Sequence, residues 1–416
     1  MPEGRTGQIS QVETDGAPRG LPPGPTAGLT PGLPSDVAEA LAGPLVDHHC
    51  HGVRRDGLDR PGFERLIVEG GLPAPPGTTH FDSPVGLAIR RWCAPVLGLP
   101  PHAAPADYLA RRADLGSHEV NRRLLREAGI GDFCVDTGLN DPGLLSPAEM
   151  GLAGGGRGHE VVRVERVAEE VAERGPSAAK FADEFAEELF RRAGAAVALK
   201  SIIAYRHGLD FDPWPPEPGE VVAAVSRWFA GYHAHERLTD PVLLRHGLWT
   251  AVGVAREYGL PIQFHTGFGD PDLALHRANP LLMTDFVRAV RPAPIVLLHC
   301  HPYVREAAAL AAVYPHVNID VGLAVTYTAA GSATVIAEAL ELTPFHKILF
   351  SSDCYALPEL CRLGALFHRR GLGAVLARRI ADGEWSPRDA ARIARLIGEG
   401  NARRLYRLTR TEKREQ

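Results

Sequence analysis

Three histidines follow an apolar stretch near the start of the chain, where Leu45 and Val46 lead into His48, His49 and His51. The apolar residues are typical of the buried end of a β-strand, in which successive side chains point to opposite faces. His49 and His51 therefore share one face, and His48 points away from them. Because neutral histidine is the commonest protein ligand of zinc-like ions, the pair could bind a metal. A single His-x-His pair is a weak indication, however, in a chain that contains 18 histidines.

Residues of the metal-binding type also end three later apolar runs of strand length. These three residues are His265, His299 and Asp353, which end the fifth, sixth and eighth such runs. Each alone has an ordinary explanation, since a histidine at a strand end usually forms hydrogen bonds and an aspartate often caps the next helix. Together with His49 and His51, they favour one shared metal site.

Apolar runs of strand length occur eight times, and amphipathic helical stretches such as 179–192 and 250–258 separate most of them. Strands separated by helices imply parallel pairing, and eight such units match a closed (β/α)8 TIM barrel of the α/β class. Active sites of this fold lie at the carboxyl ends of the strands, so we expect the polar residues above to converge at one mouth. The run 161–167 could equally be the start of the following helix. The runs begin at Leu45 and continue at 132–136, 161–167, 195–203, 261–265, 295–299, 317–321 and 347–351.

The remaining stretches set the domain organisation. Residues 1–34 are rich in Gly and Pro and lack an apolar signal core, so we expect a disordered tail without a secretion signal. Residues 35–416 are expected to form the barrel domain. Within it, 52–131 has no evident strand, and helical periodicity at 105–128 predicts a helical cap inserted after the first strand. The segment 392–408 is expected to form a terminal amphipathic helix.

The composition is that of an ordinary globular protein. The chain has 416 residues, of which 45% are hydrophobic and 23% charged, with a formal net charge of −5 and a pI near 6.4. No basic excess indicates nucleic acid as a partner, and no apolar segment approaches the roughly 18 residues that cross a membrane. The six cysteines form no CxxC pair, so we expect reduced thiols in a cytoplasmic protein, with Cys50, Cys300 and Cys354 filling space at strand ends. A chain of this size also suits a homo-oligomer.

The order His-x-His, His, His and Asp along the predicted strands resembles the amidohydrolase superfamily. The surrounding sequence is similar to the amidohydrolase-related branch, which includes domains fused to or neighbouring glutamine-synthetase-like proteins. The resemblance covers residues 40–408. It implies a divalent metal, usually zinc, and hydrolysis of amides or related bonds, although some relatives decarboxylate instead. The matching stretches are 45–51, 199–206, 297–320 and 347–353.

By position, the resemblance implies that His49, His51, His265 and Asp353 bind the metal. A bound metal lowers the pKa of a water molecule to about 7 and polarises the carbonyl under attack. Asp353 would contact both the metal and the water, so it is the expected general base, which passes the proton to the leaving nitrogen. His299 would either polarise the substrate oxygen at a site with one metal or bind a second metal.

Lys200 lies in the fourth run, where relatives with two metals carry a lysine that CO2 has carboxylated and that bridges the ions. If Lys200 points into the barrel, it could take this role, and His299 would then bind the second metal. Alternatively, Lys200, Tyr205 and Arg206 hold an anionic group of the substrate, with Arg206 acting through its bidentate guanidinium. A third interpretation pairs Lys200 with a buried carboxylate.

Three further histidines need an interpretation. His301 shares a face with His299 and precedes a proline, so we expect it in a loop, either lining the pocket or at the surface. His233 and His235 repeat the His-x-His spacing, but no strand-like run precedes them, and two residues apart in a helix lean to different faces. We therefore expect no metal site at His233 and His235.

The leading hypothesis is a metal-dependent hydrolase that cleaves a C–N amide bond in a small molecule. The glutamine-synthetase association of the resembled branch suggests a γ-glutamyl amide or a similar carboxylate-bearing substrate. A metal-dependent decarboxylase on the same site is the first alternative, and a catalytically inactive binding or regulatory barrel is the second. Oxygen from labelled water enters the product only in the hydrolase, and metal content separates both enzymes from the inactive barrel.

Overall fold

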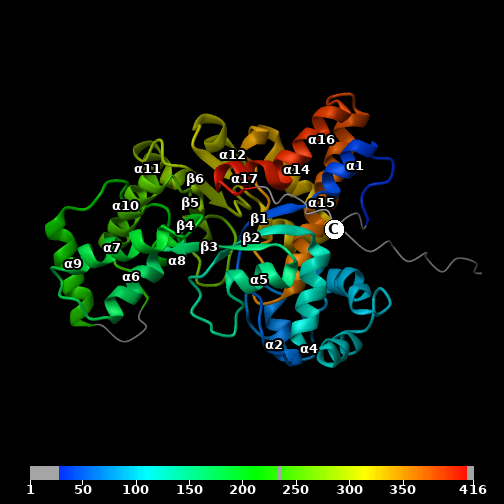
Figure 1. Ribbon diagram of the computed structural model, residues 1–416, viewed down its shortest axis with the longest axis horizontal. Coiled ribbons are helices and arrows are strands. Elements are labelled where there is room, and N and C mark those ends of the chain that lie inside the picture. Colours follow the sequence, from blue (N-terminus) through cyan, green and yellow to red (C-terminus); the bar gives the residue numbers. More distant parts are fainter. Residues whose placement is uncertain (1–27, 232–236, 410–416) are drawn as a thin grey trace, which may run out of the picture.

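The computed structural model describes residues 28–231 and 237–409, with a curled sheet of seven parallel strands at its centre (Figure 1). The strands follow one another in chain order, and helices lie between successive strands, which is the arrangement of a (β/α) barrel. Most of the tail expected at 1–34 falls outside the described residues. The strands are β1 (Leu45–Cys50), β2 (Ile130–Asp136), β3 (Arg157–Arg163), β4 (Ala198–Ser201), β5 (Ile262–His265), β6 (Ile295–Leu298) and β7 (Val317–Ile319).

The eighth predicted strand departs from the expected pattern. Residues 347–351 form no regular strand and make a single bridge, to Ile319 of β7. The Leu349 amide donates to the Ile319 carbonyl at 3.0 Å, and the His48 amide of β1 donates to the Phe350 carbonyl at 3.2 Å. The segment therefore lies between β7 and β1 and closes the barrel, although its pairing is too sparse for a regular ladder.

The run 161–167 divides between two elements. β3 ends at Arg163, and α6 (Val164–Glu173) begins at the next residue. The first four residues of β3 are polar or small and only half-buried, so no apolar alternation marks them in the sequence. The valines lie instead at the end of β3 and on the buried face of α6. The apolar run at 161–167 therefore marks the junction of the two elements, and the strand begins earlier than predicted.

The other predicted helices are present. α4 (Pro105–Ala128) has the bounds expected from its periodicity, α7 (Phe181–Ala193) covers all but the first two residues of the stretch 179–192, and α10 (Pro241–Tyr258) contains the stretch 250–258. The terminal segment divides into α16 (Pro387–Arg395), a π-helical turn and α17 (Asn401–Leu405). The remaining α-helices are α1 (Ser35–Ala42), α2 (Arg60–Leu66), α3 (Pro84–Ala88), α5 (Pro147–Gly154), α8 (Ile203–Arg206), α9 (Pro218–Ala230), α11 (Thr284–Ala289), α12 (Val304–Val313), α13 (Gly322–Thr328), α14 (Ser332–Leu342) and α15 (Pro358–Ala381).

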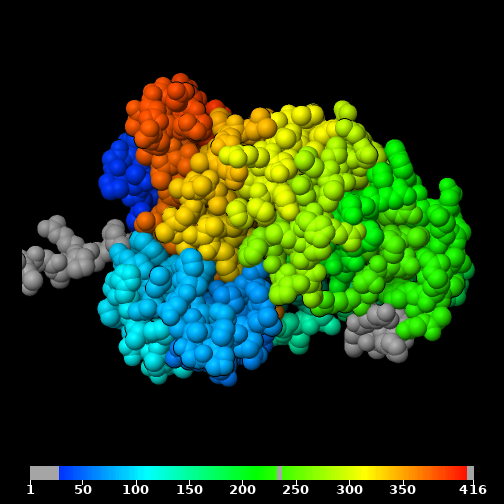
Figure 2. All heavy atoms as spheres, turned by 180° about the vertical axis from the view of Figure 1, so that it is seen from behind, coloured from blue at the N-terminus to red at the C-terminus, as the bar shows by residue number. Residues whose placement is uncertain are grey.

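Residues 52–131 carry helices α2, α3 and α4, and they pack as a lobe on the barrel. Figure 2 shows this cap, coloured blue to cyan, against the gold segment that includes α13, on which α3 packs. A buried ion pair joins the cap to α15, because the Glu359 carboxylate accepts from Arg112 Nε at 2.6 Å and from the Tyr108 hydroxyl at 2.7 Å. This ion pair holds the cap on the barrel, because removing either partner would leave the other charge buried and unpaired, at a large cost in free energy.

One helical stretch, Gly322–Leu342, is long and apolar enough to cross a membrane, contrary to the expectation that no segment approaches that length. It consists of α13, a short 3-10 turn and α14, and 56% of its apolar window is buried inside the fold. Both helices pack against α15. Burial against neighbouring helices is sufficient reason for the apolar composition of this stretch.

Apolar strand side chains such as Val46, Val161 and Leu298 fill the inside of the barrel. Ala402 of α17 and Tyr406, which follows it, pack into the same cluster. The C-terminal segment thus reaches the interior of the barrel, close to the strand ends that carry the histidines.

Candidate metal centre

His49 and His51 leave β1 on the same side, as strand alternation predicts, with ring centroids 5.3 Å apart. His49 is fully buried, and its Nδ1 lies 2.9 Å from the side-chain oxygen of Gln263. A carbonyl oxygen accepts only from a protonated Nδ1, so Nε2 of His49 keeps its lone pair for the cavity. His51 Nδ1 lies 3.3 Å from the Asp136 carbonyl. Both imidazoles therefore present Nε2 as a ligand atom.

Asp353 faces these rings from the segment after the closing run. Its backbone has a left-handed φ of 48°, and its amide donates to the His49 carbonyl at 3.2 Å. Asp353 Oδ1 lies 3.1 Å from His49 Nε2 and 3.8 Å from His51 Nε2, and Oδ2 lies 3.6 Å from His299 Nδ1. Ligand atoms of His49, His299 and Asp353 all lie within 4.8 Å of one another. Residues distant in the sequence therefore meet at one mouth of the barrel.

A second group of possible ligand atoms within 4.8 Å of one another combines His49 and His51 with Asp136. Asp136 ends β2 and is buried, and Arg163 of β3 donates to its carboxylate at 2.7 Å. Burial alone raises the pKa of Asp136, but Arg163 and the nearby histidines more than offset this and lower the pKa below its usual range. Sequence reasoning missed this aspartate, although it ends the second apolar run as Asp353 follows the eighth.

His299 directly follows β6 in a left-handed conformation with φ of 68°. Its amide donates to Asp320 Oδ1 at 3.0 Å, and the other oxygen of Asp320 lies 3.0 Å from His48 Nε2. His48 faces away from the cavity, as predicted, and its Nδ1 lies 2.8 Å from the Tyr406 hydroxyl. A positive φ costs a residue with a Cβ atom roughly 1–3 kcal/mol, so the buried Asp320 carboxylate is what holds His299 in place.

His265 ends β5 but lies beside the cluster. Its ring centroid is 4.6 Å from that of His299 and 4.4 Å from that of Tyr205. Among the described residues, neither group of converging ligand atoms includes His265. The structure thus gathers three of the four expected ligands, His49, His51 and Asp353, adds His299 to them, and leaves His265 at the edge.

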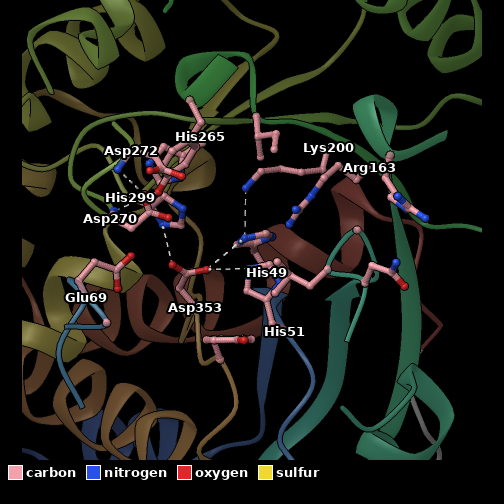
Figure 3. Close-up of a pocket in the computed structure, with 18 of the residues that line it drawn as sticks. His49, His51, Glu69, Arg163, Lys200, His265, Asp270, Asp272, His299 and Asp353 are labelled. Atoms are coloured by element: carbon pink, nitrogen blue, oxygen red, sulfur yellow. Dashed lines mark hydrogen bonds and ion pairs between the residues drawn. The ribbon is translucent and has the colours of Figure 1, made fainter. Parts of the chain in front are cut away.

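A cavity of about 520 Å3 opens over this cluster. Figure 3 shows side chains of opposite charge on its two sides, with Lys200 and Arg163 on one side of Asp353 and Glu69 and Asp270 on the other. Glu69 follows α2, so the cap supplies part of the wall. Sequence reasoning missed Glu69, because periodicity cannot place a residue in a loop of the cap.

The amidohydrolase family model matches residues 46–408 of the chain. The chain belongs to the amidohydrolase family. A solved structure from Lactobacillus casei, provisionally described as a metal-dependent hydrolase, is 26% identical with a TM-score of 0.78, and the match covers 88% of this chain and 95% of that one. Protein fluG of Emericella nidulans is 31% identical over 227 residues, which are 51% of this chain and 26% of fluG. This amidohydrolase therefore spans about a quarter of the length of fluG.

Glucuronate isomerase of Caulobacter crescentus has the same fold. It is 15% identical to this amidohydrolase with a TM-score of 0.58, and the match covers 92% of this chain and 97% of the isomerase. At this identity the likeness shows the fold alone. The (β/α) barrel is thereby confirmed, and the reaction has to be inferred from the site.

The side chains at the centre of this amidohydrolase fit a divalent cation. Asp353 Oδ1 and His299 Nδ1 are buried and have no hydrogen-bond partner within the part of the chain that the structure describes. Burial lowers the pKa of His49 and His299 well below the usual range, so both rings are neutral and can donate a lone pair. Burial raises the pKa of Asp353 to about 7, and a nearby cation would favour its ionised form. Neutral imidazoles with a carboxylate form a donor set that suits zinc.

Lys200 points into the barrel, where its Nζ lies 3.3 Å from His49 Nε2. No carboxylate of the residues described is within ion-pair distance of Lys200, so the structure does not support its pairing with a buried carboxylate. Burial lowers the pKa of Lys200 to about 8. This shift enlarges the share of neutral amine, which is the form that reacts with CO2.

Tyr205 and Arg206 both line the cavity, but each has a partner in the protein. Arg206 Nη2 lies 3.3 Å from a carboxylate oxygen of Glu169, and the Tyr205 hydroxyl accepts from the Asp270 amide at 3.4 Å. Glu169 thus engages one nitrogen of the Arg206 guanidinium, whereas the buried Nε of Arg206 has no hydrogen-bond partner among the described residues. The substrate-binding role of Arg206 stays a prediction.

His301 is not among the residues that line the cavity, so its place in the pocket stays a prediction. It is half-buried in the loop after β6, where its carbonyl accepts from the Phe268 amide at 2.6 Å. The pair His233 and His235 lies outside the described residues.

Proposed function

We propose that the protein is a zinc-dependent hydrolase that cleaves a C–N amide bond in a small carboxylate-bearing molecule, for example a γ-glutamyl amide. The observation that carries the proposal is the meeting of His49, His51, His299 and Asp353 at one mouth of the barrel, beneath a cavity of about 520 Å3. A cavity of this size accommodates a small molecule. The likeness to the metal-dependent hydrolase of Lactobacillus casei supports the same reaction class.

His49, His51 and Asp353 would hold the metal, and His299 together with a carboxylated Lys200 would hold a second ion. When bound, the metal supplies Lewis acidity, which lowers the pKa of a water molecule to about 7 and polarises the amide carbonyl. Asp353 accepts a proton from the attacking water and delivers it to the leaving nitrogen. Its buried position supports this role, because a carboxyl group with a pKa raised to about 7 can both take up and release a proton near neutral pH.

The basic residues of the cavity support a carboxylate on the substrate. Arg65, on the exposed side of α2, lines the cavity and forms no ion pair within residues 28–231 and 237–409. A guanidinium without a partner can bind a carboxylate through two parallel hydrogen bonds. Arg65 is therefore better placed for this task than Arg206, which Glu169 already engages.

The test uses zinc-loaded protein and a panel of γ-glutamyl amides in water enriched in heavy oxygen. We expect the label in the carboxylate product, and a loss of turnover by about a hundredfold to ten-thousandfold in Asp353→Asn. His276→Ala, which removes an exposed imidazole away from the cavity, is the matched control and should retain full activity. Product without label, or full turnover by Asp353→Asn at equal metal content, would contradict the proposal.

A further inference from the structure

Two carboxyl groups in the cavity wall opposite Lys200 have no cationic partner. Glu69 of the cap and Asp270 of the loop after β5 both line the cavity (Figure 3). Within residues 28–231 and 237–409, no lysine or arginine forms an ion pair with either group. Burial, together with the nearby Asp353 and Asp270, raises the pKa of Glu69 to about 8. Neighbouring carboxylates disfavour each other's charged form, and a bound cation relieves this repulsion.

Most arginines that line the cavity are already paired with a carboxylate, and the unpaired Arg65 forms no ion pair with Glu69 or Asp270 within the described residues. Three of those that line the cavity bind a carboxylate of the protein: Arg163 with Asp136 at 2.7 Å, Arg206 with Glu169 at 3.3 Å, and Arg237 with Asp272 at 2.8 Å. Glu69 and Asp270 are therefore carboxyl groups of the wall without a lysine or arginine partner among the described residues.

Two tyrosines flank these carboxyl groups. The Tyr327 hydroxyl, from α13, hydrogen-bonds to Glu69, and its ring packs edge-on against Phe268 with centroids 6.1 Å apart. The Tyr205 hydroxyl accepts from the Asp270 amide at 3.4 Å. The faces of tyrosine rings attract organic cations, and carboxylate and phenol oxygens accept hydrogen bonds from an ammonium group. Carboxylates with tyrosines therefore suit an ammonium group.

His265 points to a ligand at the same place independently of the carboxyl groups. The residue is 5% exposed, it lines the cavity, and its Nε2 has no hydrogen-bond partner in the part of the chain described. A Cβ atom added at Gly269 would lie 2.9 Å from this nitrogen and closer still to the Tyr205 hydroxyl. Gly269 thus leaves open the space in front of these two polar atoms. A neutral imidazole nitrogen can accept a hydrogen bond from an ammonium group there.

We propose that Glu69, Asp270, Tyr205 and Tyr327 form an ammonium pocket that binds a primary ammonium group of the substrate while its amide bond lies at the metal centre. The inference rests on the proposed function and narrows its substrate class to amides that also carry an amine. The amine can belong to the acyl part or to the leaving part of the amide, since both would place a cation within the same cavity.

Two pairs of probes of matched shape distinguish these sources. γ-Aminobutyramide and pentanamide differ only by an ammonium group on the acyl side, and N-acetylputrescine and N-pentylacetamide differ only by one on the leaving side. Binding to zinc-loaded protein is measured by calorimetry, and product analysis detects any hydrolysis, in which case KM replaces the dissociation constant. The proteins are the wild type, Glu69→Gln, Asp270→Asn, the double variant, and Glu39→Gln, which removes an exposed charge on α1.

We expect the ammonium member of at least one pair to bind roughly tenfold to a hundredfold more tightly than its neutral partner. The double variant should lose this preference, and Glu39→Gln should keep it. Equal binding of the neutral probes by all proteins shows that the cavity is intact. If the double variant does not fold, the preference for the ammonium probe must fall at least about threefold in each single variant. No preference in the wild type for either pair, or a preference that survives both substitutions, overturns the ammonium pocket. These probes carry no carboxylate, so the proposed hydrolysis is tested separately by label uptake from water enriched in heavy oxygen, with the γ-glutamyl amides.

Discussion

Replacing Gln263 by leucine should weaken metal binding although no metal ligand is replaced. Gln263 lies in β5 with no exposed surface, and its side chain makes three hydrogen bonds. Its oxygen lies 2.9 Å from His49 Nδ1, and its amide nitrogen donates to the His48 carbonyl at 2.8 Å and to the Tyr406 hydroxyl at 3.0 Å. Gln263 therefore fixes both the tautomer of His49 and the direction in which its Nε2 points.

The magnitude follows from the groups that leucine would leave behind. The His49 ring nitrogen and the His48 carbonyl lose their bond to Gln263 in a region that water does not reach, and each unpaired group costs about 1–3 kcal/mol. The Tyr406 hydroxyl keeps its bond to His48. Leucine restores most of the volume, so we expect the free energy of unfolding of the metal-free protein to fall by about 2–5 kcal/mol. Because His49 is no longer held in one tautomer, metal affinity should fall by about tenfold to a hundredfold.

Two measurements separate the two effects. Urea denaturation of the chelated protein reports the free energy of unfolding, and competition with a chelator reports metal affinity. Asn121→Leu is the matched control, because Asn121 is a buried amide that donates to the Arg54 carbonyl at 2.9 Å, away from the histidines. The control should lose stability but keep its metal affinity. If Gln263→Leu binds metal as tightly as the wild type, or if both variants lose affinity equally, the positioning role of Gln263 is refuted.

Three further outcomes follow from the charges. Glu359→Gln should lower the free energy of unfolding by about 3–5 kcal/mol in urea denaturation, because it leaves the buried Arg112 without its carboxylate. Burial lowers the pKa of Lys200 from 10.5 to about 8, so between these pH values the unfolded chain retains a proton that the folded chain has released, and stability rises with pH. Lys200→Met should remove a rise on the order of 3 kcal/mol from the denaturation profile measured between pH 8 and 10.5. If Lys200 is carboxylated, metal analysis should give two ions per chain with bicarbonate and one without it, whereas an unchanged count would leave Lys200 and His299 outside a second metal site.

The sequence predicts the elements whose side-chain pattern is regular. α4 has the expected bounds, because its apolar residues recur at helical spacing on both sides of a non-helical break at Gly116. Gly129 ends the helix in a left-handed conformation. The start of β3 could not be predicted, because its first residues are polar and half-buried, so neither face shows an apolar alternation. The closing run 347–351 was expected to be a strand since it is apolar, but hydrogen bonding to both neighbours is too sparse for one. The apolar residues of a run indicate that it is buried, whereas a strand also requires regular backbone hydrogen bonds to its neighbours.

The same distinction explains which site residues the sequence indicates. His49, His51, His299 and Asp353 stand where an apolar run stops, and a polar residue at such a point is visible in the sequence. Gln263 is enclosed within an apolar run and therefore has the position of a core residue, although it binds His49. The contribution of the cap depends on how its loops fold over the barrel, for which periodicity contains no information.

The C-terminal segment shows that the core of the barrel and the metal centre are one structure. Tyr406 packs with the strand side chains inside the barrel, and its hydroxyl contacts both His48 and Gln263. His48 in turn contacts the Asp320 carboxylate that holds the strained backbone of His299. A left-handed backbone at a ligand persists only where its surroundings favour it over the relaxed form. Because one buried hydroxyl thus supports residues on β1 and β5 and, through His48, the carboxylate that holds His299, the ligands keep their places only while the interior below them stays packed.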